Sequence, residues 1–578
     1  MRKDKPRAEH PSTMAVAQDS PPPAETLGVL AAHGADPPTT PAPETPTMCN
    51  EELERLGRQR PEILKSWLVE VSFVTTVVLS MMMSEYFISG FFICLPAVAV
   101  SLDMPDSVRT WPAAVINLTT ACLLLPFSRL ADRHGAKVVF LSGHAWLVAW
   151  SLISGFSRNS TMLIVCRAMQ GLGVGAFMPT GIALLARAYR PGPRKNLVFS
   201  LYGAFACIGF YVGIFFGALS AELLTWRWYF WLGCIMCALV FLLGAFSIPR
   251  GLGATDPSAQ MDWWGVCTIV PGLVLVVFAF TNGSHAPDGW RTPYIYVTLI
   301  IGALLLCAAV YCQGWVSKQP LLPAEIFRPK YMKRMLGGLF CLYGVFGLFL
   351  FYVSFYIEEA LHIGPLLAAA WFTPLAVGGM FLAICGGFLL HILPNRILMI
   401  ISELGFFLSV LLFALIPRRS SDGDPSISFL YWAYVFPAMI CGTIGIDITF
   451  NVSNVFITTA MPQRLQSTAG GLINSVLYLG LAFWLGIGEM AVSTAVQYKG
   501  AENVDKDQQF RIGFWTGVAL AALAFVLLIT VRMGKASAAL TADEKAELET
   551  VETVERGQDG GEKGGTRAGD PAGVTKAG

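Results

Sequence analysis

The sequence predicts an all-α polytopic membrane protein with fourteen transmembrane helices, and its composition and the spacing of its charges support this. Of the 578 residues, 54% are hydrophobic and 14% are charged, whereas soluble domains carry about 25% charged residues. The mean hydropathy is +0.57. Ionisable residues gather at the two ends and in short connecting stretches. The apolar runs between them reach about twenty or more residues, enough to cross about 30 Å of hydrocarbon.

Fourteen apolar segments follow one another along the chain, and each is a candidate transmembrane helix. Their approximate centres are Glu85, Thr120, Leu147, Val174, Ile208, Ala238, Leu273, Ala303, Gly347, Gly378, Phe407, Ile444, Tyr478 and Ala521. An even number of crossings puts both termini on one side. Loops after even-numbered segments are rich in Lys and Arg, and most loops after odd-numbered segments are more acidic. Because Lys and Arg mark the cytoplasmic side, we expect both termini in the cytoplasm.

The order of segments predicts five regions. Residues 1–62 are rich in Pro, Ala and Thr and are expected to form a disordered cytoplasmic N-terminal tail. Residues 65–250 form a first six-helix bundle, 260–318 two extra linking transmembrane helices, and 332–534 a second six-helix bundle. Residues 535–578 form a disordered cytoplasmic C-terminal tail. The stretches 173–213 and 445–486 share a plan of two Gly-bearing segments around a short basic turn, and such internal repeats are typical of transporters.

Several classes of protein are excluded. The net charge of +1 gives no basic face for nucleic acid. The thirteen cysteines are scattered without the spacing of metal ligands or disulfide frameworks. Neither a GxxxxGK[ST] phosphate loop nor a nucleophile constellation is present. We therefore expect no enzyme, no ATP-driven pump, no metal and no cofactor. Sequons at Asn159 and Asn282 fall in loops predicted to lie outside and are candidate glycosylation sites.

Three motifs occur in the first half. The turn Ser128–Lys137 reads SRLADRHGAK, in which Asp132, Arg133, Gly135 and Lys137 are expected to form a cytoplasmic gating loop. The fourth segment contains CRAMQGLGVG, with Arg167, Gln170, Gly171 and Gly173. In the fifth segment, Gly209, Gly213 and Gly217 recur every four residues and allow close helix packing.

These motifs resemble those of the major facilitator superfamily. The turn matches G-x-L-x-D-R-x-G-R-K except at Ser128 and Ala136, and the fourth segment matches R-x-x-Q-G-x-G. The glycines of the fifth segment match the antiporter motif G-x-x-x-G-P-x-x-G-G in part, because Ile214 replaces the proline and Ala218 the last glycine. The stretch DITFNVSNVFITTAMPQRLQSTAGGLINS is similar to the aminotriazole-resistance-like fungal branch of the fourteen-span drug:proton antiporter family.

Polar residues within apolar segments are the candidates for substrate binding and proton coupling, because they are costly in lipid. Glu85 and Arg167 lie at compatible depths, and we hypothesise that they pair. A purely structural ion pair is the alternative. Asp447, Asn451 and Asn454 occupy i, i+4 and i+7 and so share one helical face. Asn474 lies one segment later. Hydrogen bonding between helices is the alternative role for these polar groups.

The resemblance implies a proton-gradient-driven secondary transporter that exports small organic or drug-like molecules by alternating access. Its expected partners are the small-molecule substrate, protons and the lipid bilayer, and a monomer is expected. The plasma membrane is the expected location, with the vacuolar membrane as the alternative. Two other functions stay open: proton-coupled uptake of a nutrient or chelate, and a non-transporting receptor or scaffold.

Overall fold

The computed structural model describes residues 59–190, 193–250, 252, 258–417, 426–500 and 504–531. Within these ranges the chain is helical and contains no β-strand. Fourteen helices are long and apolar enough to cross a membrane, and every predicted segment centre lies within one of them. The predicted fold class is therefore confirmed. The predicted tails lie almost entirely outside the described residues.

The first six spans form one group. They consist of α2 (Trp67–Ser101), α3 (Trp111–His134), α4 (Ala136–Ser154), α5 (Ser160–Ala188), α6 (Pro193–Leu223) and α7 (Arg227–Ser247). A short 3-10 helix, η1 (Asp106–Val108), precedes α3. Helix α2 packs on α5, α6 and α7, and α3 and α4 both pack on α5. These contacts make the first bundle.

The last six spans form the second group. They consist of α10 (Met332–Phe355) with η5 (Tyr356–Ala360), α11 (Pro365–Trp371) with α12 (Thr373–Ile392), α13 (Asn395–Ala414), α14 (Ile427–Leu430) with η6 (Tyr431–Val435) and α15 (Phe436–Ala460), α16 (Gln463–Lys499) and α17 (Lys506–Leu528). Helix α10 packs on α16 and α17, and α13 packs on α15 and α17. The 3-10 helix η4 (Ala324–Phe327) precedes this second bundle.

The two bundles meet through equivalent helices. Helix α3 is the second span of the first bundle and packs on α16, the fifth span of the second bundle. In the same way, α6 is the fifth span of the first bundle and packs on α11 and α12, which form the second span of the second bundle. This reciprocal pairing is what two related halves would produce. The internal repeat fits the same scheme, because its two copies fall on the fourth and fifth spans of each bundle.

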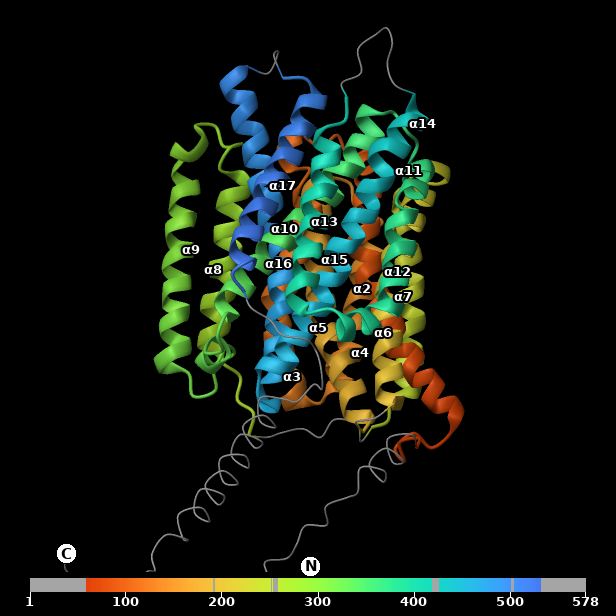
Figure 1. The fold of residues 1–578 in the computed structure, drawn as a ribbon. Coiled ribbons are helices and arrows are strands. Elements are labelled where there is room, and N and C mark those ends of the chain that lie inside the picture. Colours follow the sequence, from red (N-terminus) through yellow and green to blue (C-terminus); the bar gives the residue numbers. More distant parts are fainter. Residues whose placement is uncertain are drawn as a thin grey trace, which may run out of the picture. The chain divides into compact units, whose positions relative to one another are not determined.

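The two extra helices are central in the sequence but peripheral in space (Figure 1). They are α8 (Trp263–Asn282) and α9 (Pro293–Tyr311), with η2 (Gly289–Arg291) between them and the π-helix η3 (Cys312–Val316) after α9. Helix α8 contacts both α3 and α16, and α9 packs mainly on α8. Asp262 joins the two helices, because it caps α8 through the Gly265 amide at 2.9 Å and also accepts a hydrogen bond from the Ser317 hydroxyl.

Candidate functional site

Glu85 lies in the middle of α2, on the side that faces α6 and α16. The helix begins where the Ser66 hydroxyl accepts a hydrogen bond from the Val69 amide at 3.3 Å. Glu85 is eighteen residues from Trp67, the first residue of α2, which corresponds to about 27 Å along the helix. Its carboxylate interacts electrostatically with Tyr202 and Cys207 of α6 and with Tyr478 of α16.

Close glycine contacts hold α2 against α6. A Cβ atom on Gly209 would lie 2.6 Å from the Met82 carbonyl oxygen, and one on Gly217 would lie 2.4 Å from the Gly90 oxygen. Gly213 is equally close to Tyr86. Only glycine fits at these distances. The glycines of α6 therefore set the position of the α2 segment that carries Glu85.

Asp447 belongs to the second bundle and contacts the thiol of Cys207, which also lies near Glu85. The Cys207 Sγ donates to the Asp447 Oδ1 at 3.9 Å, and a Cβ atom on Gly379 of α12 would lie 3.0 Å from the Asp447 Oδ2. Cys207 also interacts with Glu85. The structure thus places two sequence-predicted carboxylates, one from each bundle, around Cys207 at the interface between the bundles.

The other polar residues predicted on α15 and α16 are half-buried. The Asn454 side-chain amide donates to the Phe450 carbonyl at 2.9 Å, and the Asn474 amide donates to the Gly470 carbonyl at 3.0 Å. Both bonds are to the same helix one turn earlier, so each amide oxygen stays available for another partner. Asn451 lies one turn from Asp447 on α15.

Arg167 lies in the interior of the first bundle and does not pair with Glu85 in the part of the chain that the structure describes. Its side chain is fully buried. Its Nε donates to the Pro112 carbonyl at 3.0 Å and its Nη1 to the Phe87 carbonyl at 2.8 Å. The guanidinium carbon lies 4.1 Å from the centre of the Phe91 ring.

The pairing hypothesis fails because of helical register. Glu85 and Phe87 are two residues apart, which turns them about 200° around α2. The Phe87 side of the helix faces Arg167, so Glu85 points toward α6 instead. Gln170 completes the arginine network: its Oε1 accepts from the Arg167 Nη1 at 3.1 Å, and its Nε2 donates to the Ser151 hydroxyl at 3.1 Å. Arg167 thereby links α5 to α2, α3 and α4.

Two further glycines bring α5 close to its neighbours. A Cβ atom on Gly171 would lie 2.4 Å from the Ile116 carbonyl oxygen of α3, and one on Gly173 would lie 3.0 Å from the Gly143 oxygen of α4. Since Arg167 is one turn away on the same helix, these contacts fix the depth of its guanidinium group relative to α3 and α4.

The turn Ser128–Lys137 connects helices within the first bundle. The Asp132 Oδ1 accepts from the Arg187 Nη2 of α5 at 2.9 Å. Gly135 has φ = 94°, which ends α3 and starts α4 in a conformation that suits glycine. The Lys137 ammonium donates to the carbonyls of Ala245, at 3.3 Å, and Ile248 after α7. Arg133 is exposed.

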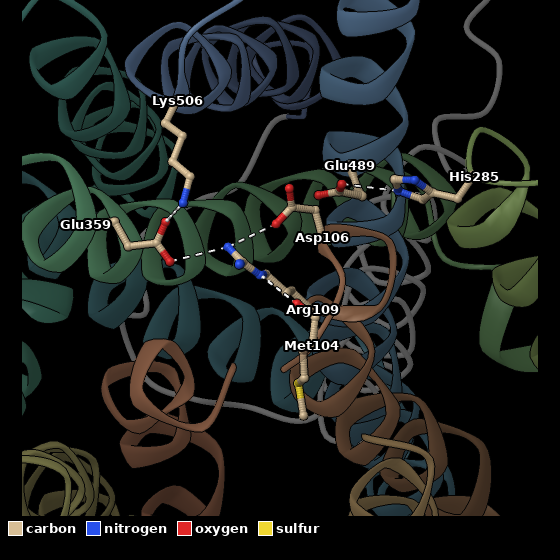
Figure 2. A network of polar contacts seen from close by, with 7 residues as sticks. All are labelled: Met104, Asp106, Arg109, His285, Glu359, Glu489 and Lys506. Carbon is tan, nitrogen blue, oxygen red and sulfur yellow. Dashed lines mark hydrogen bonds and ion pairs between the residues drawn. The ribbon is translucent and has the colours of Figure 1, made fainter. Parts of the chain in front are cut away.

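The opposite end of the bundles carries an ion-pair network that the sequence argument missed (Figure 2). Arg109, after η1, contacts Asp106 at 3.0 Å and Glu359 of η5 at 3.3 Å. The Lys506 ammonium at the start of α17 contacts the same Glu359 at 3.1 Å. This network joins the first bundle to the second. We call this end of the bundles the Arg109 end and the other the Asp132 end.

Two other groups were missed. Near the Asp132 end, the Arg194 guanidinium of α6 donates to both oxygens of Glu70 at 2.8 Å, and the Tyr189 hydroxyl donates to Glu70 at 3.1 Å. In the second bundle, Glu403 of α13 is a buried carboxyl group. A single acidic residue in the apolar run LMIISELGFF was the available signal for Glu403, whereas nothing in the sequence indicates which groups Glu70 contacts.

The candidate glycosylation residues have different surroundings. Asn159 is exposed and caps α5, because its Oδ1 accepts from the Met162 amide at 2.8 Å. Asn282 is half-buried at the end of α8, and its Oδ1 accepts from the Trp111 indole at 3.3 Å. No group of three or more His, Cys, Asp or Glu side chains that could hold a metal ion is found among the described residues.

Comparisons with known proteins agree with this architecture. The Major Facilitator Superfamily profile matches residues 76–485. The efflux pump terJ of Aspergillus terreus is 30% identical over 486 residues, covering 82% of this chain and 89% of that protein. The low affinity ammonium transporter of Saccharomyces cerevisiae is 30% identical over 475 residues, covering 81% of this chain and 89% of that protein.

The aminotriazole resistance protein of Saccharomyces cerevisiae is 27% identical over 476 residues, covering 81% of this chain and 85% of that protein. This confirms the resemblance to the fungal aminotriazole-resistance branch. Among solved structures, an auto-inhibited POT family peptide transporter superposes with a TM-score of 0.59 at 13% identity, covering 80% of this chain and 98% of that one. That likeness supports the fold alone. The chain therefore belongs to the Major Facilitator Superfamily and is a multi-pass membrane transporter rather than an enzyme.

Proposed function

We propose that this transporter exports small organic molecules in exchange for protons by alternating access. The observation that carries the proposal is that Glu85 of the first bundle and Asp447 of the second bundle both lie near Cys207. Alternating access moves two halves of a transporter against each other around a site near the middle of the membrane. Two carboxylates at that interface can hold a proton in one state and release it in another.

Competition for the same carboxylates would couple the two fluxes. A proton bound to Glu85 or Asp447 neutralises the charge, and a basic or hydrogen-bond-donating substrate prefers the ionised form. Binding of either ligand then disfavours the other, which is the requirement for exchange. Export is supported by relatives described as efflux pumps, including terJ.

The position of the ion pairs supports a conformation that is closed at the Arg109 end. The Arg109–Glu359 contact crosses between the bundles there, and so does the hydrogen bond from the Leu366 amide to Glu222 at 2.7 Å. At the Asp132 end, the pair Asp132–Arg187 stays within the first bundle. We infer that the Arg109 end faces outside and that both termini are cytoplasmic, in a monomer at the plasma membrane.

Uptake is the second candidate. The low affinity ammonium transporter is as similar to this chain as terJ is, so proton-coupled entry of a small cation is compatible with the same pair of carboxylates. Direction separates the two functions, because export lowers and uptake raises the amount of substrate inside cells that produce the protein.

The test is transport by purified protein in liposomes with an imposed pH gradient. A fluorescent organic cation and ammonium are the two probes, and internal pH is followed in parallel. We expect uptake of the organic cation into vesicles whose interior is acidic, with protons leaving as it enters. Glu85→Gln and Asp447→Asn should each lower this gradient-driven exchange by about tenfold or more, because each removes one proton-binding group.

Glu62→Gln is the matched control, since Glu62 is exposed and precedes α2. It should transport like the wild type. Transport that is indifferent to the pH gradient, or full gradient-driven exchange in both core variants, would contradict the proposal. Ammonium movement in the same direction as protons would favour uptake instead.

A further inference from the structure

Glu403 is a buried carboxyl group without a partner. Its side chain is 1% exposed, and neither carboxyl oxygen has a hydrogen-bond partner in the part of the chain that the structure describes. It lies eight residues after Asn395, where α13 begins, and eleven before Ala414, where the helix ends. These separations correspond to about 12 Å and about 16 Å, so the group lies near the middle of its span.

The packing of α13 leaves Glu403 facing apolar surroundings. The Ser402 hydroxyl next to it donates to the Gly445 carbonyl of α15 at 2.7 Å. A Cβ atom on Gly517 of α17 would lie 3.2 Å from the Val410 Cγ1. Glu403 precedes Val410 by seven residues, or two helical turns, and so shares its face. Glu403 is therefore on the side of α13 that packs against α17, next to the α15 contact.

Among the residues that the structure describes, no charge on the neighbouring helices compensates a carboxylate at this position. On α15, Asp447 is turned toward Cys207. The charged and titratable groups on the packed helices are Lys333, Arg334, Cys341, Tyr343, Tyr352, Tyr356, Glu358 and Glu359 of α10 and η5, Tyr431 and Tyr434 of η6, Cys441 and Asp447 of α15, and Lys506, Asp507 and Arg511 of α17. The three charged residues of α17 lie in its first two turns, where Lys506 pairs with Glu359 and Arg511 pairs with Asp507.

An ionised carboxylate in such a place would be strongly disfavoured. Moving an unpaired charge from water to an apolar interior is strongly unfavourable, and a carboxyl group avoids that cost by binding a proton. A proton on one oxygen removes the charge. The neutral acid then keeps a hydroxyl donor that can reach a partner after a small movement of α13.

We propose that Glu403 is a third proton-carrying residue of the transport cycle, besides Glu85 and Asp447. This rests on the proposed proton coupling. In the conformation closed at the Arg109 end, Glu403 holds a proton. When the helices around α13 move apart and water reaches the group, the O–H bond breaks, the proton passes to water, and a solvated carboxylate remains until the helices close again.

The first test is infrared spectroscopy of the purified protein in lipid, because the C=O stretch of a protonated carboxyl group differs from that of a carboxylate. At neutral pH we expect a protonated-carboxyl band in the wild type that is weaker by one group in Glu403→Gln. Glu62→Gln should leave the band unchanged. Equal bands in the wild type and Glu403→Gln would overturn the proposal. Since no substrate is needed, this result is independent of the direction of transport.

The second test separates a proton carrier from a permanently protonated side chain. In liposomes, Glu403→Gln should change the pH dependence of transport, and Glu403→Asp, which keeps a carboxyl group, should restore it in large part. An unchanged pH profile in a fully active Glu403→Gln protein would overturn the proposal. If Glu403→Gln does not fold, the pH of the wild type and of Glu403→Asp is raised instead, and we expect the protonated-carboxyl band to weaken as the group loses its proton. A band that persists at every pH would overturn the proposal.

Discussion

Replacement of Gly213 by alanine should destabilise the first bundle, because the added methyl group has no room. A Cβ atom at Gly213 would lie 2.6 Å from the Ser89 Oγ and 2.7 Å from the Tyr86 carbonyl oxygen. Ser89 cannot simply rotate away at no cost, since its hydroxyl donates to the carbonyls of Glu85 and Phe210, both at 2.7 Å. Helix α2 would have to move away from α6.

Gly203 on the same helix provides the matched control. Nothing lies within 4 Å of a Cβ atom built there. Both substitutions exchange glycine for alanine within α6, so the gain in helix propensity of about 1 kcal/mol is common to them. The difference between the variants is then the overpacking cost, about 1–3 kcal/mol.

Thermal unfolding in detergent measures this difference. At roughly 2–4 °C per kcal/mol for a unit of 150–250 residues, the apparent Tm of Gly213→Ala should lie roughly 2–12 °C below that of Gly203→Ala. Gly203→Ala should equal or exceed the wild type. Equal apparent Tm values for the two variants would refute the reasoning from close packing.

Three further outcomes are expected. Glu359→Gln removes the ion pair with Arg109. Because a partly exposed ion pair contributes about 1 kcal/mol, the population of molecules open at the Arg109 end should rise about fivefold. Distances between spin labels placed across that end measure this population. Glu70→Gln should lower the free energy of unfolding by about 1–3 kcal/mol. This is less than the loss expected for a fully buried ion pair, because Arg194 is partly exposed. A double-mutant cycle in thermal unfolding measures the loss. Burial raises the pKa of Asp262, but hydrogen bonds from its neighbours outweigh this and hold it below its usual range. Its ionised form therefore stabilises the fold above about pH 4, and the stability difference between wild type and Asp262→Asn should vanish as the pH falls below that value.

The helices were predictable because the bilayer allows few alternatives. A chain in hydrocarbon must satisfy its backbone hydrogen bonds within each segment, so apolar length alone places the fourteen helices. Local contacts were predictable for a similar reason. Arg167 and Gln170 are three residues apart on one helix and face the same way, and Gly135 marks the turn at which α3 ends.

The partners of Arg167 were not predictable, since carbonyl groups carry no sequence signature. The hypothesis of pairing with Glu85 used depth and ignored rotation about α2, and a shift of two residues changes the facing side of a helix. The convergence of Glu85 with Asp447 depends on how the two bundles dock. Glu403, in contrast, was open to the argument that singled out Glu85, because it too is an acidic residue in an apolar run.

The extra helices constrain which interface between the bundles can open. Helix α8 is tied to α3 through the Trp111–Asn282 hydrogen bond and to α16 through the Gln497–Ser284 bond at 2.7 Å. If α3 and α16 separated, one of these attachments and the apolar contact of α8 with both helices would be lost. Helices α6, α11 and α12 have no such element across them among the described contacts. Movement that closes and opens the two ends should therefore keep α3 and α16 together as a hinge and change the packing of α6 against α11 and α12, beside Cys207 and Asp447.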